Sequence, residues 1–364
     1  MSERPWVAPG SSAPQGPPPP PPYPGAPPPP GYAPPPPPPP TGAPAYAGLE
    51  FRPGIIPLRP LGLGDLYGAV TKAVRGNVAA TIGLAVVTSL ICLVPTTALG
   101  AWVASTDTTD FLAQDGTEVG LVGSYLPSLG ALVSSIALTG FLAYVVGQAV
   151  LGRKVGIGET WDGTKRRLPA LAGALVVTVV GALVVLAVVL GLPIAWLVAA
   201  GAQAGPIFLL VVIVFVAIAL YFFLWTRTAF VTAVIVLEGR GVWSAFVRSW
   251  RLTAGRPFWR ILGIRLLTAV IVGFAGNLIT VPITVIGVIA VMALGGENQL
   301  FMWQAVLAGL ASLLSGALTT PFSAGVDALM LVDQRIRREG LDVQLIQAAQ
   351  QGGPAPWPSA AGVR

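Results

Sequence analysis

Six long stretches of apolar residues dominate the hydrophobic pattern, and charged residues are almost confined to the segments between them. Each stretch is longer than the ~20 residues that an α-helix needs to cross a bilayer. The pattern predicts membrane-spanning helices at about 78–104, 121–151, 168–200, 206–236, 261–294 and 301–332. We therefore expect an all-α integral membrane protein with about six transmembrane helices.

The composition supports the same class of protein. Hydrophobic residues make up 54% of the chain and charged residues only 10%, whereas about a quarter of the residues in a soluble domain are charged. So few charges cannot cover so much apolar material with a surface that dissolves in water.

The segments between the apolar stretches alternate in charge. Segments 105–119, 199–205 and 295–300 carry acidic residues or no charge, and none of the 21 lysines and arginines lies in them. Basic residues are retained on the cytoplasmic side of a membrane. The alternation predicts a multi-pass protein of the plasma (inner) membrane with both termini in the cytoplasm.

Short segments at 63–77, 157–169 and 241–257 precede the first, third and fifth apolar stretches. Each combines apolar or aromatic residues with basic ones, which is typical of an amphipathic helix lying in the membrane interface. Two interpretations remain open. The segments either begin three copies of one unit, an interfacial helix plus a hairpin, or resemble one another by chance, because Gly, Ala and Val are so frequent.

The segment between Arg227 and Glu238 forms the end of the fourth stretch and is itself apolar. We interpret it as a helix that continues along the interface.

Residues 1–54 are rich in proline, with uninterrupted runs at 17–22, 27–30 and 34–40. Proline fixes φ and lacks an N–H, so the segment is expected to be a solvated polyproline II chain. Such chains bind aromatic grooves of partner domains; the alternative is a tether without a dedicated partner. We divide the chain into a disordered cytoplasmic tail (1–54), a six-span membrane domain (55–345) and a disordered cytoplasmic C-terminal tail (346–364).

Polar residues inside the apolar stretches are candidate site residues, because polar groups are unfavourable in a bilayer. They are Arg227, Arg265, Asn277 and Asp327. An ion pair between Asp327 and either Arg227 or Arg265 would neutralise a buried carboxylate. A hydrated or snorkelling side chain, and a role in transport or catalysis, remain the alternatives.

A charged cluster follows the sixth stretch. Its members are Asp333, Arg335, Arg337, Arg338 and Glu339. We expect a juxtamembrane cap that ends the sixth span, with arginines that contact anionic lipid headgroups.

Several classes of chemistry lack their usual residues in this sequence. The chain has no histidine and a single cysteine, Cys92, which lies in an apolar stretch. No phosphate-binding glycine loop, paired-carboxylate site or nucleophile elbow is present. We expect no cofactor, no metal site and no enzymatic activity, and we assign the net charge of +6 to membrane topology rather than to nucleic-acid binding.

Three segments resemble landmarks of a bacterial family of six-span proteins. They read IPLRPLGLGDLYGAVTKAVRGN, VLEGRGVWSAFVRSWRLTAGRPFWRILG and DQRIRREGLD. The family is the membrane domain attached to some glycerophosphodiester phosphodiesterases, with free-standing actinobacterial relatives that carry Pro-rich tails, and the resemblance covers about 55–345. It implies the architecture, since the phosphodiesterase chemistry belongs to a separate domain with histidine and acidic metal ligands.

Two functions fit these observations. The first is a non-enzymatic scaffold or accessory protein whose Pro-rich tail binds a cytoplasmic partner. The second is a transporter or a lipid-handling membrane protein. A third hypothesis, an enzyme of glycerolipid metabolism, rests on the resemblance alone.

Overall fold

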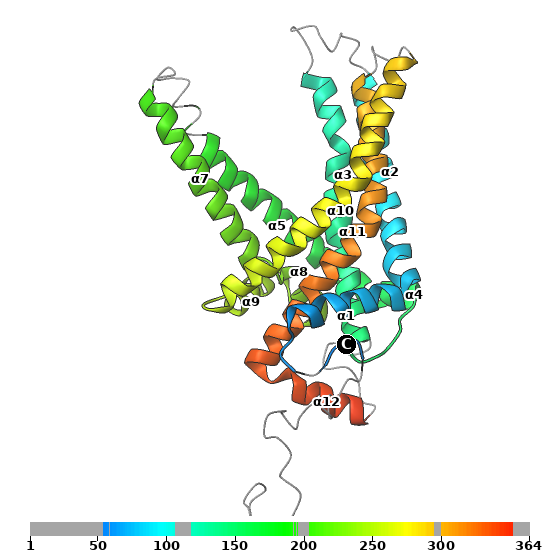
Figure 1. Cartoon of the computed structure of the whole chain (residues 1–364), viewed down its shortest axis with the longest axis vertical. Helices are drawn as coiled ribbons and strands as arrows, with labels where there is room; N and C mark the ends of the chain where they lie inside the picture. The colour runs from blue at the N-terminus through cyan, green and yellow to red at the C-terminus, as the bar shows by residue number, and fades with distance from the viewer. Residues whose placement is uncertain are drawn as a thin grey trace, which may run out of the picture. The chain divides into compact units, whose positions relative to one another are not determined.

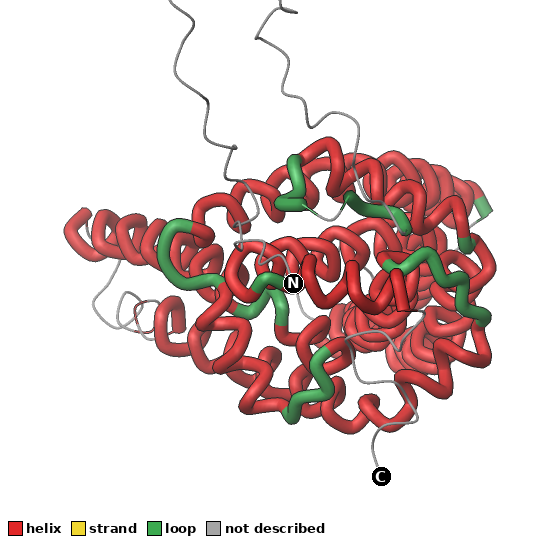
Figure 2. Tube along the Cα trace, turned by 90° about the horizontal axis from the view of Figure 1, so that it is seen from below, coloured by secondary structure: helices red, strands yellow, loops and turns green. Residues whose placement is uncertain are grey.

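A computed structural model of the chain describes residues 54–57, 59–105, 118–191, 193, 195, 204–294 and 300–351. Helices are the only regular elements in these residues (Figure 1), and the connections that the structure describes are short loops (Figure 2). In chain order the elements are α1 (Leu63–Gly76), η1 (Ala79–Gly83), α2 (Leu84–Ser105), α3 (Glu118–Val150), α4 (Ile157–Thr164), η2 (Lys165–Arg167), α5 (Leu168–Leu186), η3 (Ala187–Gly191), α7 (Ala204–Arg227), α8 (Val231–Leu237), α9 (Val242–Leu252), α10 (Pro257–Ala293), α11 (Leu300–Glu339) and α12 (Leu341–Gln351).

Six helical segments are long and apolar enough to cross a membrane. They are Ala79–Ser105, Val122–Val150, Ile157–Val189, Leu210–Leu237, Pro257–Ala293 and Leu300–Glu339. They overlap the six predicted stretches, although the third begins at Ile157 and the sixth continues to Glu339. This confirms a helical chain with six helices long and apolar enough to cross a membrane. The end of the third stretch, 196–200, lies outside the described residues, as do 1–53 of the predicted N-terminal tail.

The C-terminal boundary differs from the prediction. Helix α11 continues past residue 332 to Glu339, so the charged cluster forms its last turns. Residues 346–351, assigned to a disordered tail, belong to α12 instead. Leu341 and Leu345, in the first turns of α12, are buried in the main hydrophobic cluster, and residues 346–351 continue the same helix. Gly340, with a φ of 62°, makes the turn between the two helices.

Helices α2, α3 and α11 pack against one another, and α10 packs along α11. Small residues permit the close approach of α2 and α3. A Cβ on Gly100 would lie 2.5 Å from the Gly123 carbonyl oxygen, and one on Gly130 would lie 2.8 Å from the Cys92 carbonyl oxygen. Such contacts between backbones are possible only where side chains are absent.

Helices α5 and α7 bury much less of their surface within the chain. In the most apolar part of α3, 50% of the residues are buried, whereas only 6% are buried in the corresponding parts of α5 and α7. In Figure 1 the two helices lie beside each other and apart from α2. Their apolar side chains are therefore left for lipid or for another protein.

The three short amphipathic helices begin in the same way. Gly62, Gly156 and Gly241 precede α1, α4 and α9, with φ/ψ of −80°/171°, −81°/171° and −71°/167°. This extended conformation is the usual one for the residue that caps a helix N-terminus. In α1 the cap is completed by Asp65, whose carboxylate accepts the Gly62 N–H at 3.2 Å.

The same positions of these helices are buried. The fourth and eighth residues after each capping glycine are 0% exposed: Leu66 and Val70, Thr160 and Thr164, Ala245 and Ser249. Helix α1 packs on α11, α4 on α3, and α9 on α8. Helices α11, α3 and α8 end the sixth, second and fourth apolar stretches, so the three short helices share one packing pattern, as expected of a repeated unit. We call the end of the long helices where these helices and α12 lie the polar end.

Helix α8, predicted to continue along the interface, is buried inside the protein. All its residues except Thr232 are buried, and Phe230 directly before it is 0% exposed. The sequence VTAVIVL is apolar on every face, and α3, α5, α9 and α11 surround it. A helix without a polar face is stable only inside the protein or the lipid, and α8 forms part of the main hydrophobic cluster.

Candidate functional site

Asp333 lies at the centre of a buried polar cluster at the polar end. Its side chain is 0% exposed and accepts the Leu61 N–H at 2.8 Å. Arg260 Nη1 donates to Asp333 Oδ2 at 2.5 Å, and Arg337 Nε lies 3.0 Å from both carboxylate oxygens. The two arginines also donate to the Leu61 carbonyl oxygen, at 2.8 Å and 3.0 Å. The cluster ties the segment before α1 to α10 and α11.

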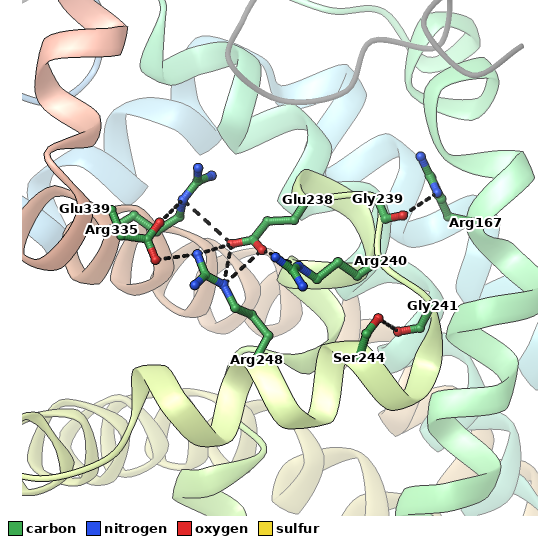
Figure 3. A network of polar contacts seen from close by, with 9 residues as sticks. All are labelled: Arg167, Glu238, Gly239, Arg240, Gly241, Ser244, Arg248, Arg335 and Glu339. Carbon is green, nitrogen blue, oxygen red and sulfur yellow. Dashed lines mark hydrogen bonds and ion pairs between the residues drawn. The ribbon is translucent and has the colours of Figure 1, made fainter.

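Glu238 organises a second cluster, drawn in Figure 3. This carboxylate follows α8 and its side chain is 8% exposed. Arg240 and Arg248 donate to it at 2.9 Å and 3.0 Å, and Arg335 Nε lies 3.7 Å away. Glu339 bridges two of these arginines, with a distance of 3.2 Å to Arg335 Nε and an ion pair to Arg248.

The second cluster holds α9 against the end of α11. Burial lowers the pKa of Arg248, but its hydrogen bonds to Glu238 and Glu339, and their charges, leave the pKa raised overall. Arg338 adds a further link from α11, because it donates to the carbonyls of Arg251 and Ala254 at 2.8 Å and 2.6 Å. A basic side chain at these carbonyls satisfies the C-terminal end of α9.

The predicted cap residues thus divide between the two clusters. Asp333 and Arg337 join the first, whereas Arg335 and Glu339 join the second. Arg338 contacts backbone only in the interactions described. The residues act within the protein as helix-to-helix contacts, in addition to marking the end of α11.

The structure pairs Asp327 with Arg265, at 3.4 Å between Oδ1 and Nε. Arg265 also lies over the ring of Trp225, 4.2 Å from its centroid, and donates to the Trp225 carbonyl oxygen. The pair therefore links α10 and α11 to the end of α7.

Arg227 is held by aromatic rings instead of a carboxylate. Its guanidinium carbon lies 5.0 Å, 5.1 Å and 5.6 Å from the ring centroids of Phe223, Trp250 and Phe258. Such contacts stabilise a cation through the ring quadrupole. Asn277 is separate from these residues, since it is exposed on α10 and donates to the Gly273 carbonyl of its own helix at 2.9 Å.

An apolar pocket of about 480 Å³ lies between α5 and α9. Its lining residues are Val177, Trp243, Phe246, Val247, Trp250 and Arg251. Helix α9 turns Ala245, Ser249 and Leu252 into the core, and it exposes Trp243 (76%) and Trp250 (42%). The guanidinium of Arg251 makes no ion pair or hydrogen bond within the described part of the chain. The surface of the pocket is therefore almost entirely apolar, and Arg251 is the one cationic residue among those that line it.

Sequence reasoning identified the amphipathic character of α9 but not this pocket or the partners of its charges. Glu238, Arg248 and Arg260 were not among the candidate site residues, because their partners on α11 are far away in the sequence. One feature of the sequence could have indicated the second cluster: Glu238 is an acidic residue in an arginine-rich segment. Within the described residues, no group of three or more His, Cys, Asp or Glu is arranged to hold a metal.

Residues 103–330 match the model of a family described as a domain of unknown function, DUF7847. No curated protein and no solved structure matched the chain. The match does not link the family to domains attached to glycerophosphodiester phosphodiesterases. It covers the residues from the end of α2 to Met330 of α11, and thus includes the α9 pocket, Glu238 and the Asp327–Arg265 pair. Since this is more than half of its length, the chain belongs to the DUF7847 family.

Proposed function

We propose that the chain is a non-enzymatic, multi-pass plasma-membrane protein that binds an anionic glycerophospholipid in the α9 pocket. The observation that carries the proposal is the combination of an apolar, tryptophan-lined pocket with the available guanidinium of Arg251. Tryptophan is enriched at the level of lipid headgroups. An acyl chain fits the apolar wall, and a phosphate fits the cation at its edge.

The expected topology supports this assignment. Lysines and arginines of the short helices and of the last turns of α11 lie at the polar end, which we place at the cytoplasmic face together with both termini. Helix α9 then lies at the depth of the headgroups, where an amphipathic helix is stable. Each basic residue near an anionic surface contributes about 1 kcal/mol, and each buried methylene of a lipid contributes about 0.8 kcal/mol.

The experiment measures lipid retention by the purified full-length protein. The protein is exchanged into detergent containing equal amounts of phosphatidylglycerol and phosphatidylcholine, and bound lipid is quantified by native mass spectrometry. We expect phosphatidylglycerol to be retained in preference. Arg251→Gln removes the cation and should reduce this preference, whereas Val177→Trp should reduce the binding of both lipids.

Arg256→Gln is the matched control, because Arg256 is also exposed and lies at the start of α10, outside the pocket. Equal loss in Arg251→Gln and Arg256→Gln would indicate a general effect of charge. Retention of both lipids by Val177→Trp at the wild-type level would contradict the proposal.

The Pro-rich N-terminal segment favours a second, compatible function as a scaffold. Its proline runs are suited to binding an aromatic groove of a cytoplasmic partner. Co-purification from membranes should lose that partner when residues 1–48 are deleted. An unchanged set of bound proteins would contradict the scaffold function and leave lipid binding unaffected.

The two remaining hypotheses rest on less. Transport would require the bound lipid or solute to cross the membrane. A relationship to the membrane domains attached to phosphodiesterases rests on the three similar sequence segments alone. Glycerophosphodiester hydrolysis by the purified protein, abolished by a single acidic substitution, would overturn the non-enzymatic assignment.

A further inference from the structure

A second pocket, of about 260 Å³, lies among α2, α3, α10 and α11. Hydroxyl groups from all four helices line it, among them Ser89, Ser134, Thr280, Ser312, Ser315 and Thr320. It lies in the middle of the long helices and is separate from the α9 pocket. In the topology proposed above, this position is inside the bilayer.

Ser89 and Ser134 leave one buried donor unused. Each residue is 3% exposed, and their Oγ atoms lie 3.1 Å apart in a hydrogen bond. Only one of the two hydroxyls donates in this bond. The hydrogen of the other has no acceptor in the described residues, although both side chains line the pocket.

Three further hydroxyls are available. Thr280 donates to the Gly276 carbonyl of its own helix at 3.1 Å. By contrast, the hydroxyls of Ser312, Ser315 and Thr320 make no hydrogen bond within the described part of the chain. A hydroxyl without a partner is unfavourable by about 1–3 kcal/mol away from water. The pocket therefore presents several groups that require a hydrogen-bonding occupant.

The lining also defines the charge of that occupant. No Asp, Glu, Lys or Arg lines the pocket, so an ion would lack a counter-charge in an apolar environment. A water molecule takes roughly 30 Å³ in the liquid, so the volume admits something larger. Hydroxyls both donate and accept, which matches a ligand that does the same. We propose that this pocket binds a small, uncharged, polyhydroxylated solute.

Glycerol is the probe for the test. The full-length protein is reconstituted in nanodiscs, and glycerol binding is followed by saturation-transfer difference NMR against empty nanodiscs. The double variant Ser312→Ala/Thr320→Val keeps the approximate shape of the pocket and removes two free hydroxyls. We expect glycerol to bind the wild-type protein and to bind this variant about tenfold more weakly.

Thr284→Val is the matched control, because its hydroxyl donates to the Thr280 carbonyl at 2.9 Å and does not line the pocket. This variant should bind glycerol as the wild type does. Ala131→Leu, which fills the pocket from α3 without removing a hydroxyl, provides an independent variant and should abolish binding.

Two outcomes overturn the proposal. One is a wild-type signal no larger than that of empty nanodiscs, which would mean that water alone occupies the pocket. The other is wild-type binding by either pocket variant. Lipid binding at the α9 pocket is measured separately, so failure of one proposal leaves the other standing.

Discussion

The backbone of Leu61 and the carboxylate of Asp333 are joined by a 2.8 Å hydrogen bond across 272 positions of sequence. Arg260 and Arg337 each contact both the carboxylate of Asp333 and the carbonyl of Leu61. Removing one partner from a buried ion pair destabilises by about 3–5 kcal/mol. Asp333→Ala should therefore lower stability by about that amount, measured by denaturant unfolding in detergent.

Asp162→Ala is the comparison for this prediction. Asp162 forms an ion pair with Lys165 at 2.5 Å, but its side chain is 64% exposed. Exposed pairs contribute about 0–1 kcal/mol, so the change should be small. Equal losses in the two variants would show that burial of Asp333 does not determine its contribution.

The Glu238–Arg248 pair should show energetic coupling in a double-mutant cycle. Glu238 and Arg248 are 8% and 21% exposed and are joined at 3.0 Å. For contacting residues the coupling free energy is about 0.5–3 kcal/mol. Cycles with Glu238→Gln, Arg248→Gln and the double variant, followed by thermal unfolding, measure it. Arg240, 46% exposed, should couple more weakly to the same carboxylate; the reverse order would contradict the geometry.

Packing of α2 against α3 should be sensitive to a single methyl group. A Cβ at Gly100 would lie 2.5 Å from a backbone oxygen, which cannot move without shifting α3. Gly100→Ala should destabilise by about 1–3 kcal/mol. Gly181→Ala on α5 meets nothing within 4 Å and should be neutral or slightly stabilising. Unfolding midpoints of the two variants separate packing from helix propensity.

Asp327→Asn should have a smaller effect than Asp333→Asn. Arg265 keeps the Trp225 ring and carbonyl as partners after the substitution, and its 3.4 Å distance to Asp327 is longer than those around Asp333. We expect a smaller loss of unfolding free energy for Asp327→Asn. A larger loss for Asp327→Asn, together with normal folding of Asp333→Asn, would contradict this prediction. It would show that Asp327, and not Asp333, makes the more important buried contact.

Much of the helical architecture is a local property of the chain. Long apolar stretches and the helical spacing of residues such as Val242, Ala245 and Ser249 are visible without any knowledge of distant contacts. For this reason the six long helices and the three short amphipathic ones were predicted near their observed positions.

The partners of individual residues depend on which helices pack together, and only the tertiary structure decided them. Either Arg227 or Arg265 was available to Asp327 by sequence, but α10 places Arg265 beside it, while the rings near Arg227 enclose that side chain. The burial of α8 has the same origin. Its apolar sequence is compatible with a lipid or a protein environment. The four helices that pack around α8 place it inside the protein.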